Sequence, residues 1–106
     1  MKKQVAICGS TGSIGTQALE VIKQQAEHFE VSLLTTNSNA DLLIKQTLVF
    51  KPNAVVIADK EKYNFVKEAL ANEPVKVFAG LDSIDQCVAM DEIDIVLTAM
   101  VGFAGL

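Results

Sequence analysis

Three glycines spaced three residues apart form the pattern in this sequence best suited to chemistry, specifically to binding an anion. Gly9, Gly12 and Gly15 directly follow the short apolar segment 5–8. A strand that passes through such a turn into a helix presents free backbone N–H groups and the positive end of the helix dipole. Glycines there permit a sharp turn, the approach of a diphosphate to the backbone, and close packing of helix against strand. The pattern predicts a dinucleotide site.

Hydroxyl side chains lie between these glycines and could add hydrogen-bond donors. The spacing is Gly-x-x-Gly-x-x-Gly, whereas the commoner dinucleotide pattern is Gly-x-Gly-x-x-Gly. A glycine-rich turn that binds no ligand is therefore the alternative interpretation. The residues expected to line the diphosphate are Gly9, Ser10, Thr11, Gly12, Ser13, Ile14 and Gly15.

A second segment, residues 35–39, bears on which dinucleotide would fit. NAD sites place an Asp or Glu about 20 residues past the glycines, where it binds the ribose 2′-OH. Counting from Gly15 leads to Thr35, and residues 35–39 contain no acid. A carboxylate would repel a 2′-phosphate, so its absence favours NADP, although no Arg or Lys is present there to neutralise that phosphate. The donors expected to contact the ribose are Asn37, Ser38 and Asn39.

Other reactive side chains are scattered, and we assign no catalytic and no metal-binding residue in this chain. Cys8 and Cys87 are expected to be buried, reduced thiols, and His28 a solvated loop residue. The acidic residues of the last third are expected at helix caps and turns, or in solvent; they are Asp82, Asp85, Asp91, Glu92 and Asp94.

Apolar segments alternate with amphipathic ones, which predicts a (βα)₄β unit. Strands are expected over residues 5–8, 29–35, 54–58, 75–79 and 93–97. Helices are expected over 14–26, over 42–50 with Asn39 or Asp41 as its cap, between Asp59 and 72–74 with Tyr63, Val66, Ala69 and Leu70 inside, and from Asp82 or Ser83 to Met90. Right-handed crossovers then give a Rossmann-type, doubly wound parallel sheet in a three-layer α/β/α arrangement, with helices on both faces.

Ligands of such a sheet bind at the carboxyl ends of its strands, where the strand order reverses. Three segments should meet at that edge: residues 9–15 at the diphosphate, 35–39 at the adenosine ribose, and 98–102 on the path toward the nicotinamide. The chemistry expected of this chain is therefore cofactor binding, with the reaction performed elsewhere.

Composition narrows the class of protein. The chain has 106 residues, enough for one domain, and its net charge of −4 argues against a nucleic-acid partner. No apolar run approaches the roughly 18 residues that span a bilayer, and none forms a signal peptide, so we expect a cytoplasmic protein without a membrane partner. The apolar, glycine-bearing end, residues 98–106, suggests a piece of a longer protein.

Several motifs together resemble one enzyme family. The heptapeptide over residues 9–15, the tripeptide 27–29, Lys51-Pro52 and the ending Thr98-Ala-Met-Val-Gly-Phe-Ala-Gly-Leu106 are similar to the N-terminal domain of 1-deoxy-D-xylulose 5-phosphate reductoisomerases. By this resemblance, Thr11, Gly12, Ser13 and Ile14 match the diphosphate-binding turn, and a segment beside the cofactor is matched by Ala99, Met100, Val101 and Gly102. The family usually has Gly, then Lys or Arg, then Asn after the second strand, and of Asn37, Ser38 and Asn39 only the last agrees.

The resemblance implies an activity for a longer parent enzyme. That enzyme would convert 1-deoxy-D-xylulose 5-phosphate to 2-C-methyl-D-erythritol 4-phosphate in isoprenoid biosynthesis, using NADPH and either Mg²⁺ or Mn²⁺. Residues 1–106 would be its NADPH-binding domain, inactive alone, because the family's catalytic, metal and substrate-phosphate groups lie beyond Leu106. NADPH and a sugar phosphate would be its small-molecule partners, and the parent would be a homodimer.

Two other functions remain open from the sequence. One is the NADP-binding domain of a different reductase, similar to semialdehyde dehydrogenases, which would need a catalytic Cys beyond Leu106. The other is a non-enzymatic Rossmann module that senses redox state. Such modules usually carry a nucleic-acid-binding part, and the acidic composition speaks against one in this segment.

Overall fold

The structure, a computed structural model, describes residues 2–80 and 93–98. Its five strands form one parallel sheet in the order β4-β3-β2-β1-β5. The strands are β1 (Lys3–Cys8), β2 (Phe29–Thr36), β3 (Ala54–Ile57), β4 (Lys76–Ala79) and β5 (Ile95–Thr98). The helices are α1 (Ser13–Gln24), α2 (Ala40–Phe50), the 3₁₀ helix η1 (Lys60–Lys62) and α3 (Tyr63–Ala69). The predicted α/β class is confirmed.

The element boundaries differ from the predictions in a few places. β1 begins at Lys3, two residues earlier than expected, and α1 ends at Gln24 instead of Ala26. The single helix expected after Asp59 is divided into η1 and α3, although Asp59 does cap it by accepting a hydrogen bond from the Glu61 amide at 3.0 Å. Ala69 was expected inside and is exposed, whereas Val66 and Leu70 are buried. The helix expected from residue 82 or 83 to 90 lies outside the described residues.

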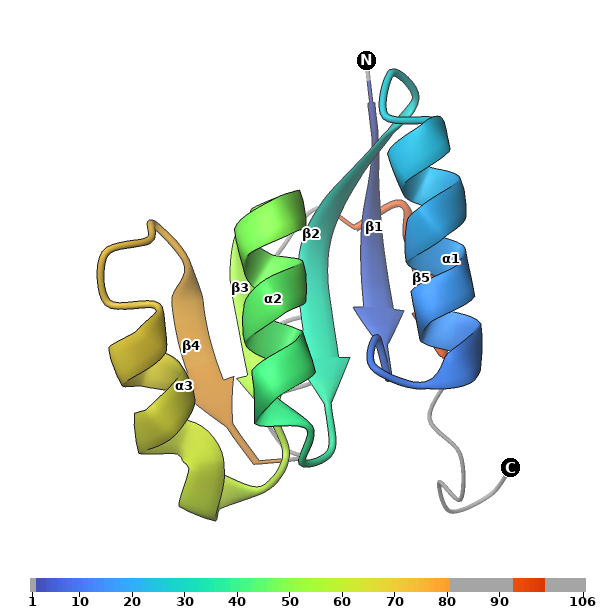
Figure 1. The fold of residues 1–106 in the computed structure, drawn as a ribbon. Coiled ribbons are helices and arrows are strands. Elements are labelled where there is room, and N and C mark those ends of the chain that lie inside the picture. The colour runs from blue at the N-terminus through green and yellow to red at the C-terminus, as the bar shows by residue number, and fades with distance from the viewer. Residues whose placement is uncertain (1, 81–92, 99–106) are drawn as a thin grey trace.

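The order of the strands places the switch point between β1 and β5. From β1 the chain steps outward through β2 and β3 to β4, and β5 pairs with the other side of β1. The loops that leave β1 and β2 emerge at the same edge of the sheet, at the bottom in Figure 1. Because parallel strands share a direction, this edge carries their carboxyl ends and is where a ligand of this fold binds.

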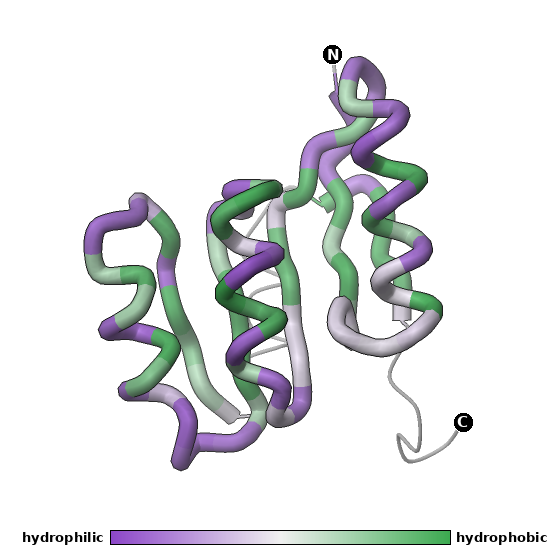
Figure 2. Tube along the Cα trace, viewed as in Figure 1, coloured by the Kyte–Doolittle hydropathy of each residue, from purple (hydrophilic) through white to green (hydrophobic). Residues whose placement is uncertain are grey.

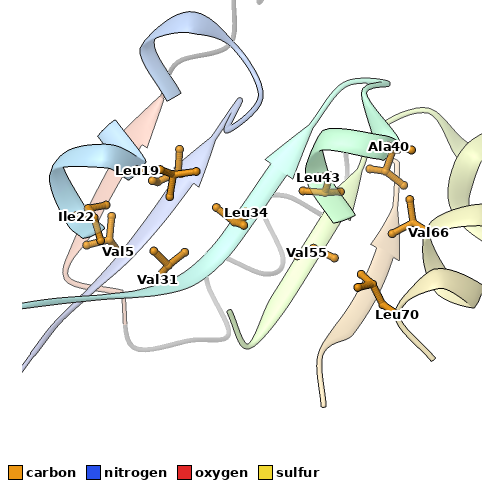
Figure 3. Close-up of a cluster of buried hydrophobic side chains, with 12 residues drawn as sticks. Val5, Leu19, Ile22, Val31, Leu34, Ala40, Leu43, Val55, Val66 and Leu70 are labelled. Carbon is orange, nitrogen blue, oxygen red and sulfur yellow. The ribbon is translucent and has the colours of Figure 1, made fainter. Parts of the chain in front are cut away.

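The larger hydrophobic cluster lies between the sheet and α1, α2 and α3 (Figure 3). Each of these helices buries part of its surface against the sheet, and Figure 2 shows apolar and polar residues alternating along it. The outward faces are not wholly polar, because large apolar side chains are exposed on all three helices; they are Ile14, Val21, Leu48, Val49 and Phe65. The buried members of this larger cluster are Val5, Ile7, Leu19, Ile22, Val31, Leu34, Ala40, Leu43, Val55, Ile57, Val66 and Leu70. No helix within residues 2–80 and 93–98 is long and apolar enough to cross a bilayer.

A smaller cluster lies on the opposite face of the sheet, because neighbouring residues of a strand point to opposite sides. Its buried members are Ala6, Cys8, Leu33, Ala54 and Val56. The three described α-helices contribute no buried residue to it, so they cover a single face. Helices were predicted on both faces of the sheet, and the one expected from Asp82 or Ser83 to Met90 lies outside the described residues.

A β-bulge at Ser32 adjusts β2 to β1. Val5 pairs with Val31, but Ala6 pairs with Leu33, so Ser32 is the extra residue. Its hydroxyl contacts the side-chain oxygen of Gln4. The bulge explains how Val31 and Leu34 reach the same cluster although three positions separate them, a spacing that regular alternation would place on opposite faces.

Candidate functional site: the glycine turn at the switch point

Residues 9–15, the glycine turn, use their glycines in three different ways. Gly9 has a φ of 89°, a left-handed conformation that favours glycine. Gly15 allows close packing, because a Cβ there would lie 2.2 Å from the Gly9 carbonyl oxygen. Gly12, the N-cap of α1, has φ −80° and ψ 175°, an extended conformation open to any residue. Backbone geometry therefore does not account for glycine at position 12.

The backbone amides of the turn divide into two groups. The Gly9 and Ser10 amides both donate to the Thr35 carbonyl, at 3.0 and 2.8 Å, and the Gly12 amide donates to the Gly9 carbonyl at 3.2 Å. Within the part of the chain that the structure describes, four amides of the turn make no hydrogen bond; they belong to Thr11, Ser13, Ile14 and Gly15. The last three form the first turn of α1, where the helix dipole also favours an anion.

The three hydroxyl side chains of the turn have different surroundings. Ser10 is fully buried, and its hydroxyl donates to Oε1 of Gln46 at 2.7 Å. The Thr11 hydroxyl lies 2.5 Å from the hydroxyl of Thr36. Ser13 is exposed, at the start of α1. Ser10 and Thr11 thus hold the turn to neighbouring elements, and the Ser13 hydroxyl is the one open to solvent.

The second predicted segment divides at the end of β2. Thr35 and Thr36 are buried within the strand, and Thr35 receives the Gly9 amide on its hydroxyl as well, at 3.0 Å. Asn37, Ser38 and Asn39 are exposed beyond it. The Asn39 side chain caps α2, as predicted, by accepting from the Leu42 amide at 3.3 Å. Residues 37–39 are therefore the solvent-facing part of the segment.

A hollow lies beside this segment, between the start of α2 and the start of α3. Its charged lining residues are two carboxylates and one ammonium group. They are Asp41, Glu61 and Lys62, and the remaining lining residues are Ser38, Asn39, Ala40 and Phe65. The connection after β3 is held against the segment, since the Asp59 amide donates to the Asn37 carbonyl at 2.8 Å.

The third predicted segment is described only at its first residue. Thr98, the last residue of β5, pairs with Cys8, so β5 ends directly beside the start of the glycine turn. Ala99, Met100, Val101 and Gly102 lie outside the described residues. The structure thus brings together the first two segments through Thr35 and Thr36, and places the start of the third next to them.

The remaining candidates lie away from the turn or are part of the sheet. Cys8 is buried, as expected, and His28 is exposed. Asp94 is exposed but joins strands instead of capping a helix, because its carboxylate accepts from the Gln4 amide at 2.7 Å. Among residues 2–80 and 93–98, no three His, Cys, Asp or Glu side chains gather as metal ligands. Outside the described residues lie Asp82, Asp85, Cys87, Asp91 and Glu92.

Two residues near the site were not predicted from the sequence. Gln46 is buried in α2 and contacts the glycine turn, and Lys62 lines the hollow beside Ser38. Gln46 follows the buried Leu43 by three positions, so helical spacing places it on the inward face. A polar residue on that face was a usable signal. Lys62 carries no comparable signal, because η1 lies beside residues 37–39 only in the folded chain, where Asp59 bonds to Asn37.

Comparison with known proteins gives consistent results. A family model described as 1-deoxy-D-xylulose 5-phosphate reductoisomerase matches residues 5–106. Proteins of that name from Phocaeicola vulgatus and Bacteroides fragilis are 58% and 60% identical over 106 and 105 residues. These matches cover 100% and 99% of this chain but 28% and 27% of the relatives, so the chain spans just over a quarter of their length.

Solved structures of the same name share the fold. One from Zymomonas mobilis, in complex with NADPH, is 34% identical with a TM-score of 0.81, covering 85% of this chain and 24% of that one. Another, in complex with magnesium, is 27% identical with a TM-score of 0.91, covering 100% of this chain and 27% of that one. The parallel sheet and its order of elements are therefore those of these structures' matched region.

Proposed function

Because this chain belongs to the 1-deoxy-D-xylulose 5-phosphate reductoisomerase family, we propose that residues 1–106 form the NADPH-binding domain of such an enzyme. The NADPH complex of the Zymomonas mobilis protein supports this assignment. Family membership also decides against the two functions left open by the sequence, a semialdehyde-dehydrogenase-like reductase and a redox-sensing module.

The observation that carries the proposal is the set of amides in the glycine turn without a partner in the described chain. The amides of Thr11, Ser13, Ile14 and Gly15 bind the cofactor's diphosphate, and the dipole of α1 adds to the attraction. Gly12 stands between them in an extended conformation, and the lack of a side chain leaves room for the phosphates. Ser13 contributes a hydroxyl donor.

The adenosine ribose and its 2′-phosphate occupy the side of the turn next to residues 37–39. Asn37, Ser38 and Asn39 are exposed there and offer neutral donors. Lys62 lines the adjoining hollow and supplies the positive charge that residues 37–39 lack, set against the carboxylates of Asp41 and Glu61. Thr98, the last residue of β5, pairs with Cys8 at the start of the turn. From the family resemblance, we infer that residues 99–102 contact the cofactor on the path to the nicotinamide.

The whole enzyme converts 1-deoxy-D-xylulose 5-phosphate to 2-C-methyl-D-erythritol 4-phosphate in isoprenoid biosynthesis, and bound NADPH supplies the hydride. Magnesium is present in a solved relative, and either Mg²⁺ or Mn²⁺ would serve. From the family resemblance, we infer that the metal and the sugar phosphate are held by groups beyond Leu106. We place the enzyme in the cytoplasm and expect it to be a homodimer.

Calorimetric titration of the chain with NADPH and NADH tests the cofactor assignment. We expect NADPH to bind more tightly than NADH, and Lys62→Ala to reduce that difference by weakening NADPH alone. Lys67→Ala is the matched control, because Lys67 lies over the Tyr63 ring on α3 and does not line the hollow. No NADPH binding by a folded chain would refute the assignment, and equal NADPH affinity in Lys62→Ala would remove Lys62 from it.

Activity can be tested in a chimera. Residues 1–106 would replace the matching segment of the Bacteroides fragilis relative, which is 60% identical over 105 residues. NADPH oxidation that depends on 1-deoxy-D-xylulose 5-phosphate is the expected result. A folded chimera that binds NADPH but never oxidises it would contradict the proposed activity and leave cofactor binding intact.

A further inference from the structure

Gln46 makes two hydrogen bonds to one residue of the glycine turn. Its Oε1 accepts from the Ser10 hydroxyl at 2.7 Å, and its Nε2 donates to the Ser10 carbonyl at 2.8 Å. The two residues are 36 positions apart, and both are buried, with exposures of 7% and 0%. The pair thus joins α2 to the turn, and both the oxygen and the nitrogen of the Gln46 side-chain amide are hydrogen-bonded.

We propose that Gln46 is a positioning residue for the cofactor site, acting through the peptide group between Ser10 and Thr11. A trans peptide is planar, so its C=O and N–H point in opposite directions. The Ser10 carbonyl is directed at Gln46, and the Thr11 amide is therefore directed away from it. That amide has no partner in the described chain and is one of the proposed diphosphate donors. The inference rests on the proposed function.

Ser10 is held on three sides. Its amide donates to the Thr35 carbonyl at 2.8 Å, while its carbonyl and hydroxyl both bind Gln46. The opposite polarity of the two Gln46 bonds also fixes the rotation of the side-chain amide, because a flipped amide would face an oxygen with an oxygen. With Gln46 in place, the Thr11 amide has its binding direction before the cofactor arrives. Such preorganisation raises affinity by lowering the cost of ordering on binding.

A purely structural role for Gln46 predicts a loss of stability without a specific loss of cofactor affinity. Thr47 provides the matched control on the next position of α2. It is equally buried, and its hydroxyl donates to the Leu43 carbonyl at 2.7 Å, within its own helix and away from the turn. Thr47→Val therefore removes a buried hydrogen bond without touching Ser10.

The experiment compares NADPH dissociation constants and urea unfolding for the wild type, Gln46→Met and Thr47→Val. We expect Gln46→Met to weaken NADPH binding about tenfold, since two hydrogen bonds that orient the turn are lost. Thr47→Val is expected to be destabilised yet to bind NADPH like the wild type. Equal affinity in Gln46→Met and the wild type would overturn the positioning role, with the proposed function standing. Absence of binding in the wild type would instead refute the proposed function.

Gln46→Glu adds a pH readout and covers the case in which Gln46→Met does not fold. An ionised carboxylate can accept from the Ser10 hydroxyl but repels the Ser10 carbonyl, whereas a protonated carboxyl restores a donor. Burial raises the pKa of such a carboxyl. The NADP⁺ affinity of Gln46→Glu, relative to the wild type at each pH, should therefore recover as the pH falls from 7 to 5. A constant ratio across that range would contradict the proposal.

Discussion

Gly15→Ala tests the close packing that brings α1 against the glycine turn. An added Cβ would lie 2.2 Å from the Gly9 carbonyl oxygen and 2.7 Å from the Ser10 Cα. Both are backbone atoms that cannot rotate away. Ordinary contact begins near 3.4 Å, so the helix must move by about 1 Å, the difference between 3.4 and 2.2 Å.

The cost of that movement follows from what α1 buries. Leu19 and Ile22 pack on the sheet with exposures of 3% and 7%. Each contributes about 1.5–3 kcal/mol when fully buried, and a gap of about 1 Å forfeits up to half of the packing. For the two side chains together, the loss is at most about 3 kcal/mol, offset by roughly 1 kcal/mol because Ala favours a helix over Gly. We expect a net loss of up to about 2 kcal/mol.

Urea unfolding followed by circular dichroism measures this difference. Gln17→Ala, at an exposed position of the same helix, is the control and should leave the stability nearly unchanged. In a thermal scan, Gly15→Ala should melt at a lower temperature than the wild type, by up to about 10 °C. A Gly15→Ala variant as stable as Gln17→Ala would show that α1 does not approach the turn this closely.

Two further substitutions test the proposed diphosphate site at Gly12 and the end of α2 at Lys51. Gly12→Val should abolish NADPH binding, because a side chain at position 12 would occupy the space of the diphosphate. The domain should stay folded, since valine tolerates the extended backbone conformation of residue 12. Titration with NADPH and circular dichroism check the two expectations, and full affinity would contradict the proposed geometry. Lys51→Gly should raise the melting temperature by a few degrees. Lys51 ends α2 with a φ of 50°, and this left-handed conformation costs a residue with a side chain about 1 kcal/mol. An unchanged or lower melting temperature would show that Lys51 is unstrained.

Much of the architecture was predictable because local signals agree with the final structure. Continuous apolar segments such as 54–57 form buried strands, and Asn39 and Asp59 cap the elements that follow them. The extra residue at Ser32 left no trace in the pattern, because apolar residues on both faces of a buried strand hide the register. The division into η1 and α3 was likewise missed, since both helix types tolerate the same residues.

The sequence located the glycine turn and the end of β2, but it did not reveal the residues that support them. Counting about 20 residues from Gly15 led to Thr35, but β2 continues through Thr36, so the side chains that face solvent begin at Asn37. Thr35 instead receives amides from the turn. The contact between Gln46 and Ser10 depends on how α2 packs over β2 next to the glycine turn, which spacing along the chain does not specify.

In the proposed cofactor site, helix α2 sets a fixed distance between the segment that contacts the ribose and the residue that orients the glycine turn. Near its start, Asn39 belongs to the segment that would distinguish a phosphorylated from an unphosphorylated ribose, and Gln46, seven residues later, orients the turn for the diphosphate. Seven residues of α-helix measure about 10 Å, a length that does not stretch. A substitution that tilts or slides α2 should therefore alter cofactor choice and overall affinity together. Exchange of Asn37 or Ser38, which precede the helix, should alter the choice alone.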